Sequence, residues 1–330
     1  MPHLTRDPPV TLHLGAHRTA TSSLQHLLER DAAPLARAGV AVWTPRRTRA
    51  GLLTGVLGDP GRQAASRDRA AHRAAGRVAM LRSEMAALGL TRLVLSEENA
   101  LGGLRENLLM ARLYPSAAPR LERLARAVPG IDRVCLAIRS PAAWWTSAFA
   151  FLMTRGFAPP DRATLEAIAS ARRGWRQVIE DVARVFPGAE VAVWEFEGIG
   201  QKPVEAFAAL TGRPPRPGPV RPLNAALPLG ALRARLRAEG CMTPLPERGG
   251  RYAPFPPDLG AALDARHAAE VTWLRDGADG LATYIDGAHE DARTGQREEA
   301  THDRRQRRYP AWAPRPLDEP GCGRVEGPRA

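Results

Sequence analysis

A polar loop near the amino end, from Gly15 to Ser22, has the residue types of a phosphate-binding site. It reads Gly-Ala-His-Arg-Thr-Ala-Thr-Ser and so offers several hydroxyl groups and one guanidinium. Residues 10–14 predict a short strand before it, and apolar residues at helical spacing predict a helix from about Thr21. Backbone N–H groups and the dipole at the start of a helix attract anions. The sequence therefore predicts that this loop holds a phosphate group.

The loop departs from the common nucleotide-binding pattern of Gly, four residues, Gly-Lys and then Ser or Thr. Ala20 takes the place of the second glycine, Thr21 takes that of the lysine, and Arg18 comes earlier. An ordinary P-loop kinase or ATPase is therefore disfavoured. The alternative without function is a strand-to-helix turn that Thr19 or Thr21 caps. Because alanine disfavours positive φ, we expect the backbone at Ala20 to avoid it.

Polar clusters also follow two later predicted strands, at residues 96–99 and 139–147. Strands are predicted at 40–43, 93–95, 134–138 and 191–194, and helices at 62–88 and 120–127. Alternating strands and helices favour a three-layer α/β/α fold with a central parallel sheet, in which ligands bind beyond the carboxyl ends of the strands. Residues 15–22, 96–99 and 139–147 all follow strands. We therefore expect them to form a single active site.

The run from His13 to Gln25 resembles the 5′-phosphosulfate loop of sulfotransferases, and its bacterial form above all. This resemblance implies a P-loop NTPase-like fold and binding of 3′-phosphoadenosine 5′-phosphosulfate (PAPS), whose sulfuryl group moves to a hydroxyl or an amine. Arg18 stands where the family has a lysine, and Ser23 where many relatives have a tryptophan. Trp144 or Trp145 is then a candidate to pack on the adenine, unless both belong to the core. The implied cofactor contacts in the loop are Gly15, Arg18, Thr19, Ala20, Thr21, Ser22 and Ser23.

Two more segments resemble sulfotransferase elements. Arg139 ends a predicted strand, and Ser147 follows eight residues later. In the family such a pair binds the 3′-phosphate, to which arginine offers a bidentate fork. A late run from Glu247 to Pro254 is similar to a loop that closes over PAPS. It would bring Arg248 and Arg251 to a phosphate, or else is a plain surface turn.

A general base is sought among the acids of the run Ser96-Glu97-Glu98-Asn99. Bacterial relatives often carry a glutamate at such a strand end. A hydroxyl attacks poorly until a base takes its proton. Glu98 is the favoured catalytic base, with Glu97 in reserve. The alternative is a pair of acids that only stabilise the start of a helix.

The leading interpretation is a PAPS-dependent sulfotransferase. Arg18 is the catalytic residue that would stabilise charge on the leaving phosphate, and no metal is required. One alternative is a P-loop-like nucleotide kinase or NTPase that needs Mg²⁺. Another is a catalytically dead relative that binds PAPS or its desulfated product. A small-molecule, carbohydrate or lipid acceptor fits the main interpretation, and the oligomeric state stays open.

Composition agrees with a globular protein. The chain has 330 residues, of which 44% are hydrophobic, and a formal net charge of +12. Lys202 is the only lysine, so arginine carries the positive charge, and aromatic residues make up just 5%. Nucleic-acid binding is therefore disfavoured. With no apolar run of membrane-spanning length, we expect a soluble cytoplasmic protein. The domain is expected at residues 8–290, followed by a disordered tail at 291–330.

Overall fold

The computed structural model describes residues 7–59, 61, 65–220, 222–240, 245 and 249–286. The chain divides into two units, residues 1–290 and 291–330. The second unit lies outside the described residues, and so does the disorder expected for it. All elements named below belong to the first unit.

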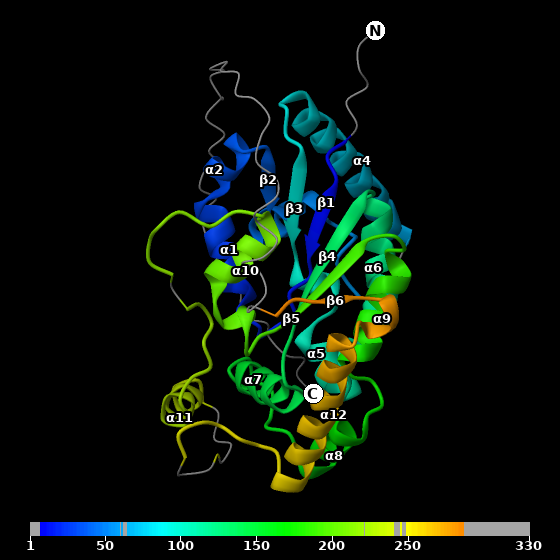
Figure 1. The fold of residues 1–330 in the computed structure, drawn as a ribbon. Helices are drawn as coiled ribbons and strands as arrows, with labels where there is room; N and C mark the ends of the chain where they lie inside the picture. Colours follow the sequence, from blue (N-terminus) through cyan, green and yellow to red (C-terminus); the bar gives the residue numbers. More distant parts are fainter. Residues whose placement is uncertain are drawn as a thin grey trace. The chain divides into compact units, whose positions relative to one another are not determined.

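A parallel sheet in the order β2-β3-β1-β4-β5-β6 forms the centre of this unit (Figure 1). The prediction of a parallel sheet is confirmed, and all five predicted strands are present. The sixth strand was missed because two residues at the sheet edge carry no periodic signal. The strands are β1 (Val10–His13), β2 (Val40–Trp43), β3 (Arg92–Ser96), β4 (Ile131–Ile138), β5 (Glu190–Glu195) and β6 (Thr283–Tyr284).

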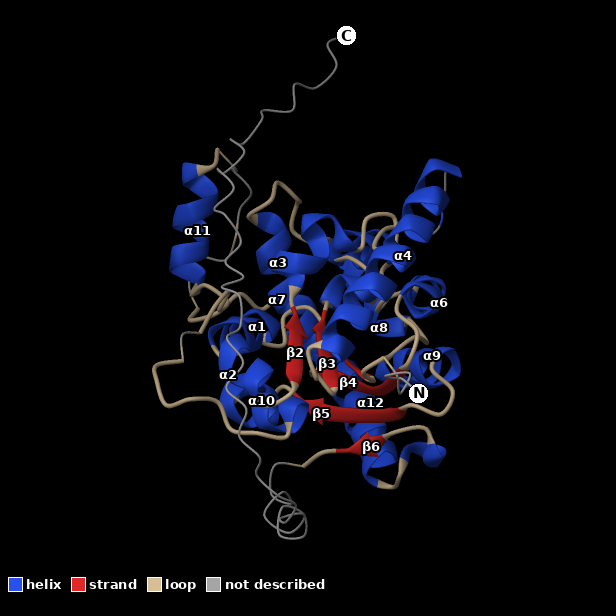
Figure 2. Cartoon of the chain, turned by 90° about the horizontal axis from the view of Figure 1, so that it is seen from above, coloured by secondary structure: helices blue, strands red, loops and turns tan. Residues whose placement is uncertain are grey.

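Helices cover both faces of the sheet (Figure 2). One hydrophobic cluster joins Leu27 and Phe207 to strand residues such as Val94. Another joins Val78 and helices further along the chain to the opposite face of the same strands. The result is the expected three-layer α/β/α arrangement. The first face carries α1 (Thr21–Arg30), α2 (Ala32–Arg37) and α10 (Pro203–Thr211), and the second carries α4 (Ala65–Ala87), α6 (Ala117–Ala127) and α9 (Trp175–Val185).

Two sequence predictions about local structure were wrong. The helical spacing of Leu24, Leu27, Leu28 and Leu35 predicts one helix that reaches Leu35, but α1 ends at Arg30 and a separate helix begins at Ala32. Asp31 at this break accepts a hydrogen bond of 2.6 Å from the backbone N–H of Arg216, which fixes the turn. The Arg, Gly and Pro residues of the stretch 45–61 predict a loop, yet this stretch begins with two helical segments. These are α3 (Pro45–Arg47) and η1 (Thr48–Leu52), with a proline at the first helical position.

The remaining elements gather near the carboxyl ends of the strands or pack beside the sheet. They are η3 (Glu98–Ala100), α5 (Leu104–Met110), α7 (Pro141–Met153), α8 (Arg162–Ser170), η4 (Ile199–Gln201), α11 (Leu229–Ala238), α12 (Pro257–Arg275) and η5 (Ala278–Gly280). Within the described part of the chain, no helix combines the length and the apolar character needed to cross a membrane.

Candidate functional site

The loop from Gly15 to Ser22 connects β1 to α1 through three residues with positive φ. A Cβ atom on Gly15 would lie 2.6 Å from His13 Cε1 and 2.7 Å from Thr21 Oγ1, so only glycine fits there. Ala20 has φ of 60° and ψ of 16°, contrary to the expectation that it avoids this region. The left-handed conformation costs a residue with a Cβ about 1 kcal/mol. The loop therefore holds Ala20 in a backbone conformation that glycine adopts without strain.

The expected capping of α1 by Thr19 or Thr21 was also wrong. Thr19 Oγ1 donates to the carbonyl of Ala16 at 2.6 Å, and Thr21 Oγ1 donates to the same carbonyl at 3.2 Å. Ala20 is the N-cap residue, and its side chain accepts nothing. The two hydroxyls thus close the loop on itself. The backbone N–H groups of residues 18–22 make no hydrogen bond to any residue that the structure describes, so they are available to an anion.

Three predicted cofactor-binding residues meet beside this loop. Arg18 Nε donates to Ser147 Oγ at 2.9 Å, and Arg139 Nη1 donates to the backbone carbonyl of Arg18 at 2.8 Å. Arg18 belongs to the loop after β1, Arg139 directly follows β4, and Ser147 lies in α7. Because β1 and β4 are adjacent parallel strands, their carboxyl ends bring the two guanidinium groups together.

Positive charge exceeds negative charge around Arg18. Burial, followed by the nearby Arg139 and Arg155, lowers the pKa of Arg18 to about 10. The guanidinium groups of Arg18 and Arg155 both lie over the ring of Phe151, at 5.0 and 3.4 Å from its centroid. Among the described residues, no carboxylate forms an ion pair with Arg18. A partly buried cation without an anionic partner is costly, so the site favours an anion.

The two arginines predicted in the late loop, Arg248 and Arg251, are the remaining candidates for a phosphate contact. Burial lowers the pKa of Arg139, Glu197 opposes this, and Arg251 contributes to the lowering. Arg251 is therefore close enough to act on Arg139, although its side chain is exposed. Arg248 lies outside the described residues.

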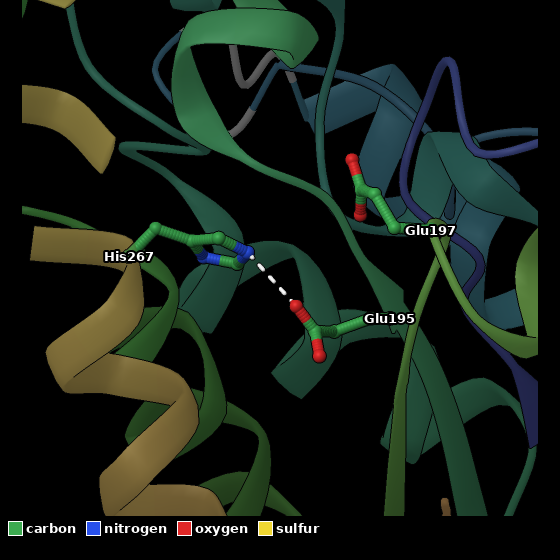
Figure 3. A group of neighbouring side chains, drawn as sticks. All are labelled: Glu195, Glu197 and His267. Atoms are coloured by element: carbon green, nitrogen blue, oxygen red, sulfur yellow. Dashed lines mark ion pairs between the residues drawn. The ribbon is translucent and has the colours of Figure 1, made fainter. Parts of the chain in front are cut away.

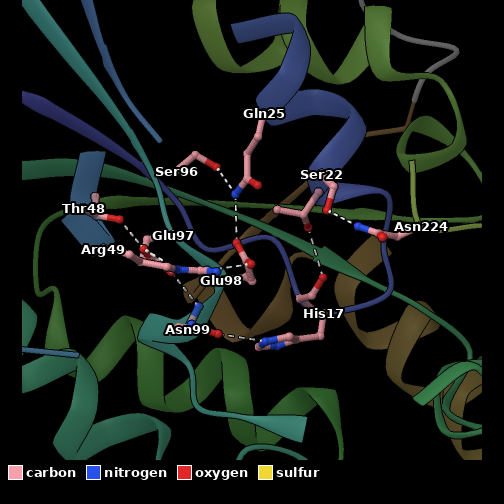
Figure 4. Close-up of polar contacts among 12 residues, drawn as sticks. His17, Ser22, Gln25, Thr48, Arg49, Ser96, Glu97, Glu98, Asn99 and Asn224 are labelled. Atoms are coloured by element: carbon pink, nitrogen blue, oxygen red, sulfur yellow. Dashed lines mark hydrogen bonds and ion pairs between the residues drawn. The ribbon is translucent and has the colours of Figure 1, made fainter. Parts of the chain in front are cut away.

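A segment between α10 and α11 lies against the loop, as Figure 4 shows for Asn224. Asn224 Nδ2 donates to Ser22 Oγ at 2.9 Å, and the Asn224 carbonyl accepts from Arg18 Nη2 at 3.0 Å. The backbone N–H of Leu223 donates to Ser23 Oγ at 2.9 Å. These contacts use polar groups of the loop, so an anion at Arg18 or Ser22 would compete with Asn224. Nothing in the local sequence pattern indicated this partner.

The two candidate bases have different surroundings (Figure 4). Glu97 is fully buried and receives hydrogen bonds from Thr48 and, at 2.6 and 3.1 Å, from two nitrogens of Arg49. It also accepts the backbone N–H of Asn99 at 3.1 Å. Through these hydrogen bonds, the Glu97 carboxylate connects η1 to the end of β3. Glu97 therefore has the surroundings of a structural residue and not of an accessible base.

Glu98 remains partly accessible, with 14% of its side chain exposed. Gln25 Nε2 donates to one carboxylate oxygen at 2.8 Å, and Arg49 Nη2 donates to the other at 2.7 Å. Burial raises the pKa of Glu98, but Arg49, His17 and the Gln25 hydrogen bond outweigh it, so the pKa is lowered. Glu98 is thus an ionised carboxylate able to accept a proton or a hydroxyl hydrogen bond, at reduced basicity.

The histidines of the loop region are held by structural contacts. The backbone N–H of His17 donates to the Tyr114 hydroxyl at 2.8 Å, and its Nε2 lies 3.1 Å from Asn99 Oδ1. Burial lowers the pKa of His17. His13 is buried with Nδ1 2.8 Å from Ser96 Oγ, and burial lowers its pKa to about 4. Both are therefore neutral packing residues at physiological pH.

The idea that a tryptophan of α7 replaces the adenine-stacking residue was wrong. Trp144 and Trp145 are 0% and 2% exposed. The indole N–H of Trp144 donates to the His17 carbonyl at 2.7 Å. Both rings therefore belong to the core beneath the loop, as the alternative interpretation held.

Sequence reasoning missed Arg49, the cation that joins Glu97 to Glu98. It is one of many arginines in a segment without periodicity, and its partners lie 48 and 49 residues away. Gln25 was noted only as part of a motif, although its spacing from Thr21 places both on one face of α1. Phe151, over which Arg18 and Arg155 lie, could not be predicted as a site residue, because it is one of several apolar residues in its helix.

No family model, no curated protein and no solved structure matches this chain. The geometry of the site is therefore the basis for any statement about function.

Proposed function

We propose that this protein is a sulfotransferase that uses PAPS. The observation that carries the proposal is the meeting of Arg18, Arg139 and Ser147 at a loop whose N–H groups, from residue 18 to residue 22, bond to none of the described residues. Two cations from adjacent strand ends suit a ligand with two separate phosphate groups, since each guanidinium can hold one. PAPS has this form, with a 5′-phosphosulfate and a 3′-phosphate.

In the proposed reaction an acceptor hydroxyl oxygen attacks the sulfur atom of the sulfuryl group. The bond from sulfur to the bridging oxygen of the 5′-phosphate breaks, and the electron pair stays on the phosphate. Arg18 and the N–H groups of the loop stabilise this charge. The acceptor's proton passes to Glu98, whose carboxylate Arg49 and Gln25 hold in place. In this proposal, the guanidinium of Arg18 and the loop N–H groups stabilise the negative charge that develops on the leaving phosphate.

Calorimetric titration of the full chain with 3′,5′-ADP, the desulfated product, tests the binding half of this proposal. We expect binding without added metal, and a loss of at least tenfold in affinity in Arg139→Gln, because a charge-assisted phosphate contact is removed. Arg133→Gln is the matched control. Arg133 lies in β4, the strand that Arg139 follows, but it pairs with Glu190 at 3.4 Å near the amino end of that strand. Equal losses in both variants would contradict the role of Arg139.

Turnover of labelled PAPS over a panel of hydroxyl and amine acceptors tests the catalytic half. If no acceptor of the panel is sulfated while 3′,5′-ADP still binds, the protein is a non-catalytic binder. A preference for Mg-ATP over 3′,5′-ADP would instead favour a nucleotide kinase or NTPase and overturn the proposal.

A further inference from the structure

A second cluster of ionisable side chains lies beyond the carboxyl end of β5 (Figure 3). Glu195 is the last residue of β5, Glu197 follows in the next turn, and His267 projects from α12. One donor atom from each residue lies within 4.8 Å of the other two. The proposed transfer uses none of them, so the cluster requires its own explanation.

The imidazole of His267 is nine-tenths buried, yet neither ring nitrogen makes a hydrogen bond to a described residue. Nε2 lies 3.2 Å from Glu195 Oε1, and Figure 3 shows the ring facing that carboxylate. The two atoms are within ion-pair distance, although the contact does not have the geometry of a hydrogen bond. Unsatisfied polar atoms in buried positions are rare, and a bound ion is one of their recognised explanations.

The other nitrogen of His267 also faces a carboxylate. Nδ1 lies 4.0 Å from Glu270 Oε2, a buried oxygen that has no hydrogen-bond partner among the described residues. Glu270 Oε1 is fixed by the backbone N–H of Arg176 at 3.2 Å. Histidines that bind metals through one nitrogen commonly direct the other N–H to a carboxylate, which sets the tautomer. Glu270 occupies this position relative to His267.

The remaining contacts leave one oxygen of Glu195 open. The hydroxyl of Tyr284 donates to Glu195 Oε2 at 2.6 Å, and Arg275 lies 3.9 Å from the same atom. Among the described residues, the contact recorded for Oε1 is the one with His267. Glu197 is 41% exposed and has a weak pairing with Arg139 at 3.9 Å. The backbone N–H of Ser140 approaches Glu197 Oε1 at 3.4 Å. Both contacts are long, and a Glu197 carboxylate oxygen already lies within 4.8 Å of the ligand atoms of Glu195 and His267.

We propose that Glu195, Glu197 and His267 bind one divalent transition-metal ion, with Zn²⁺ as the best match. One imidazole nitrogen and two carboxylate oxygens are ligands that Zn²⁺ accepts at about 2.0–2.2 Å, which in a tetrahedral site puts donor atoms roughly 3.4 Å apart. The 3.2 Å between His267 Nε2 and Glu195 Oε1 agrees with two such ligands. The ion would tie α12 to the end of β5. The ion would lie close to Arg139, with which Glu197 pairs at 3.9 Å, but no step of the proposed transfer passes through the ion.

The test uses the full chain, freed of metal with EDTA and then dialysed. Titration with ZnCl₂ is followed by calorimetry, and bound zinc is measured by elemental analysis. We expect one tight equivalent per chain, and an affinity at least tenfold lower in both His267→Gln and Glu197→Gln. Substitution with Co²⁺ gives a second readout, because a tetrahedral site shows strong visible absorption that the two variants should lose.

Matched controls separate this site from chance binding at the surface. His72→Gln removes an exposed histidine of α4, and Glu190→Gln removes a carboxylate from the other end of β5. Both should bind zinc as the unmodified protein does. If the buried His267→Gln variant fails to fold by circular dichroism, Glu197→Gln decides alone, since that side chain is partly exposed. The proposal is overturned if the unmodified protein retains no stoichiometric zinc, or if Glu197→Gln binds it unchanged.

Discussion

Arg18 Nε donates a hydrogen bond of 2.9 Å to Ser147 Oγ, although 129 residues separate them in the chain. The contact joins the loop after β1 to α7, the helix that follows β4. Both residues also belong to the proposed binding site for PAPS. The same contact therefore orders the Arg18 side chain before any ligand arrives, and a ligand would meet a guanidinium that already has a fixed direction.

Loss of the Ser147 hydroxyl should weaken the binding of 3′,5′-ADP without preventing it. Ser147→Ala removes one hydrogen bond to Arg18 and one potential donor to phosphate, for which we expect about 1 kcal/mol, or roughly a fivefold weaker Kd. Calorimetric titration measures the change. Ser170→Ala, at the exposed end of α8, is the control and should bind normally. Unchanged affinity in Ser147→Ala would remove this residue from the site.

The two neighbouring glutamates should respond in opposite ways. Glu97→Gln removes the charge of a fully buried carboxylate whose partner Arg49 is partly exposed, so we expect a loss of about 2–4 kcal/mol in the free energy of unfolding, measured with urea. Glu98→Gln should change stability little, because the side chain is partly accessible and the amide still accepts from Gln25. Under the proposed function, Glu98→Gln should abolish transfer while 3′,5′-ADP still binds. Normal turnover in this variant would exclude Glu98 as the base.

Replacement of Ala20 by glycine should not destabilise the protein. Its φ of 60° disfavours a side chain by about 1 kcal/mol, which offsets the greater flexibility that glycine gives the unfolded chain. We expect Ala20→Gly to leave the free energy of unfolding unchanged or to raise it by up to about 1 kcal/mol. Ala167→Gly in α8 is the comparison, and it should cost about 1 kcal/mol because it lies within a helix. A similar loss at both positions would mean that the loop does not hold Ala20 in this conformation.

Acid should reveal the contribution of Asp31, which is 2% exposed at the junction of α1 and α2. Burial raises its pKa, but hydrogen bonds from Arg30 and Arg216 outweigh this and lower the pKa from 3.8 to about 2. A lowered folded-state pKa means that the stabilisation is fully present above the unfolded pKa and is lost as pH falls from about 4 to about 2. We expect about 2 kcal/mol from this source.

Urea unfolding at pH 5 and pH 3 measures that contribution as the difference between the unmodified chain and Asp31→Asn. The difference should shrink at the lower pH. Asp132→Asn is the control, because its ion pair with Arg92 is exposed and such pairs contribute little. An Asp31→Asn variant with the same acid sensitivity as the unmodified chain would contradict the assignment.

The sequence by itself determined the main elements of this protein and the edge of the sheet where polar residues gather. Apolar runs such as Val40–Trp43, and the helical spacing of Leu24, Leu27 and Leu28, are local patterns that report secondary structure directly. Alternating strands and helices then require a parallel sheet, and parallel strands carry the residues after them to one edge. Arg18 and Arg139 could be placed together on this ground alone.

Only the tertiary structure decided what those residues contact. Ala20 is held in the left-handed region by the closed loop around it, although its own preference is the opposite. Arg49 distinguishes Glu97 from Glu98 through pairing across 48 residues, and one arginine among many gives no local sign of this. His267 reaches Glu195 from another element, 72 positions along the chain. Contacts of this kind depend on how elements pack, which local periodicity does not encode.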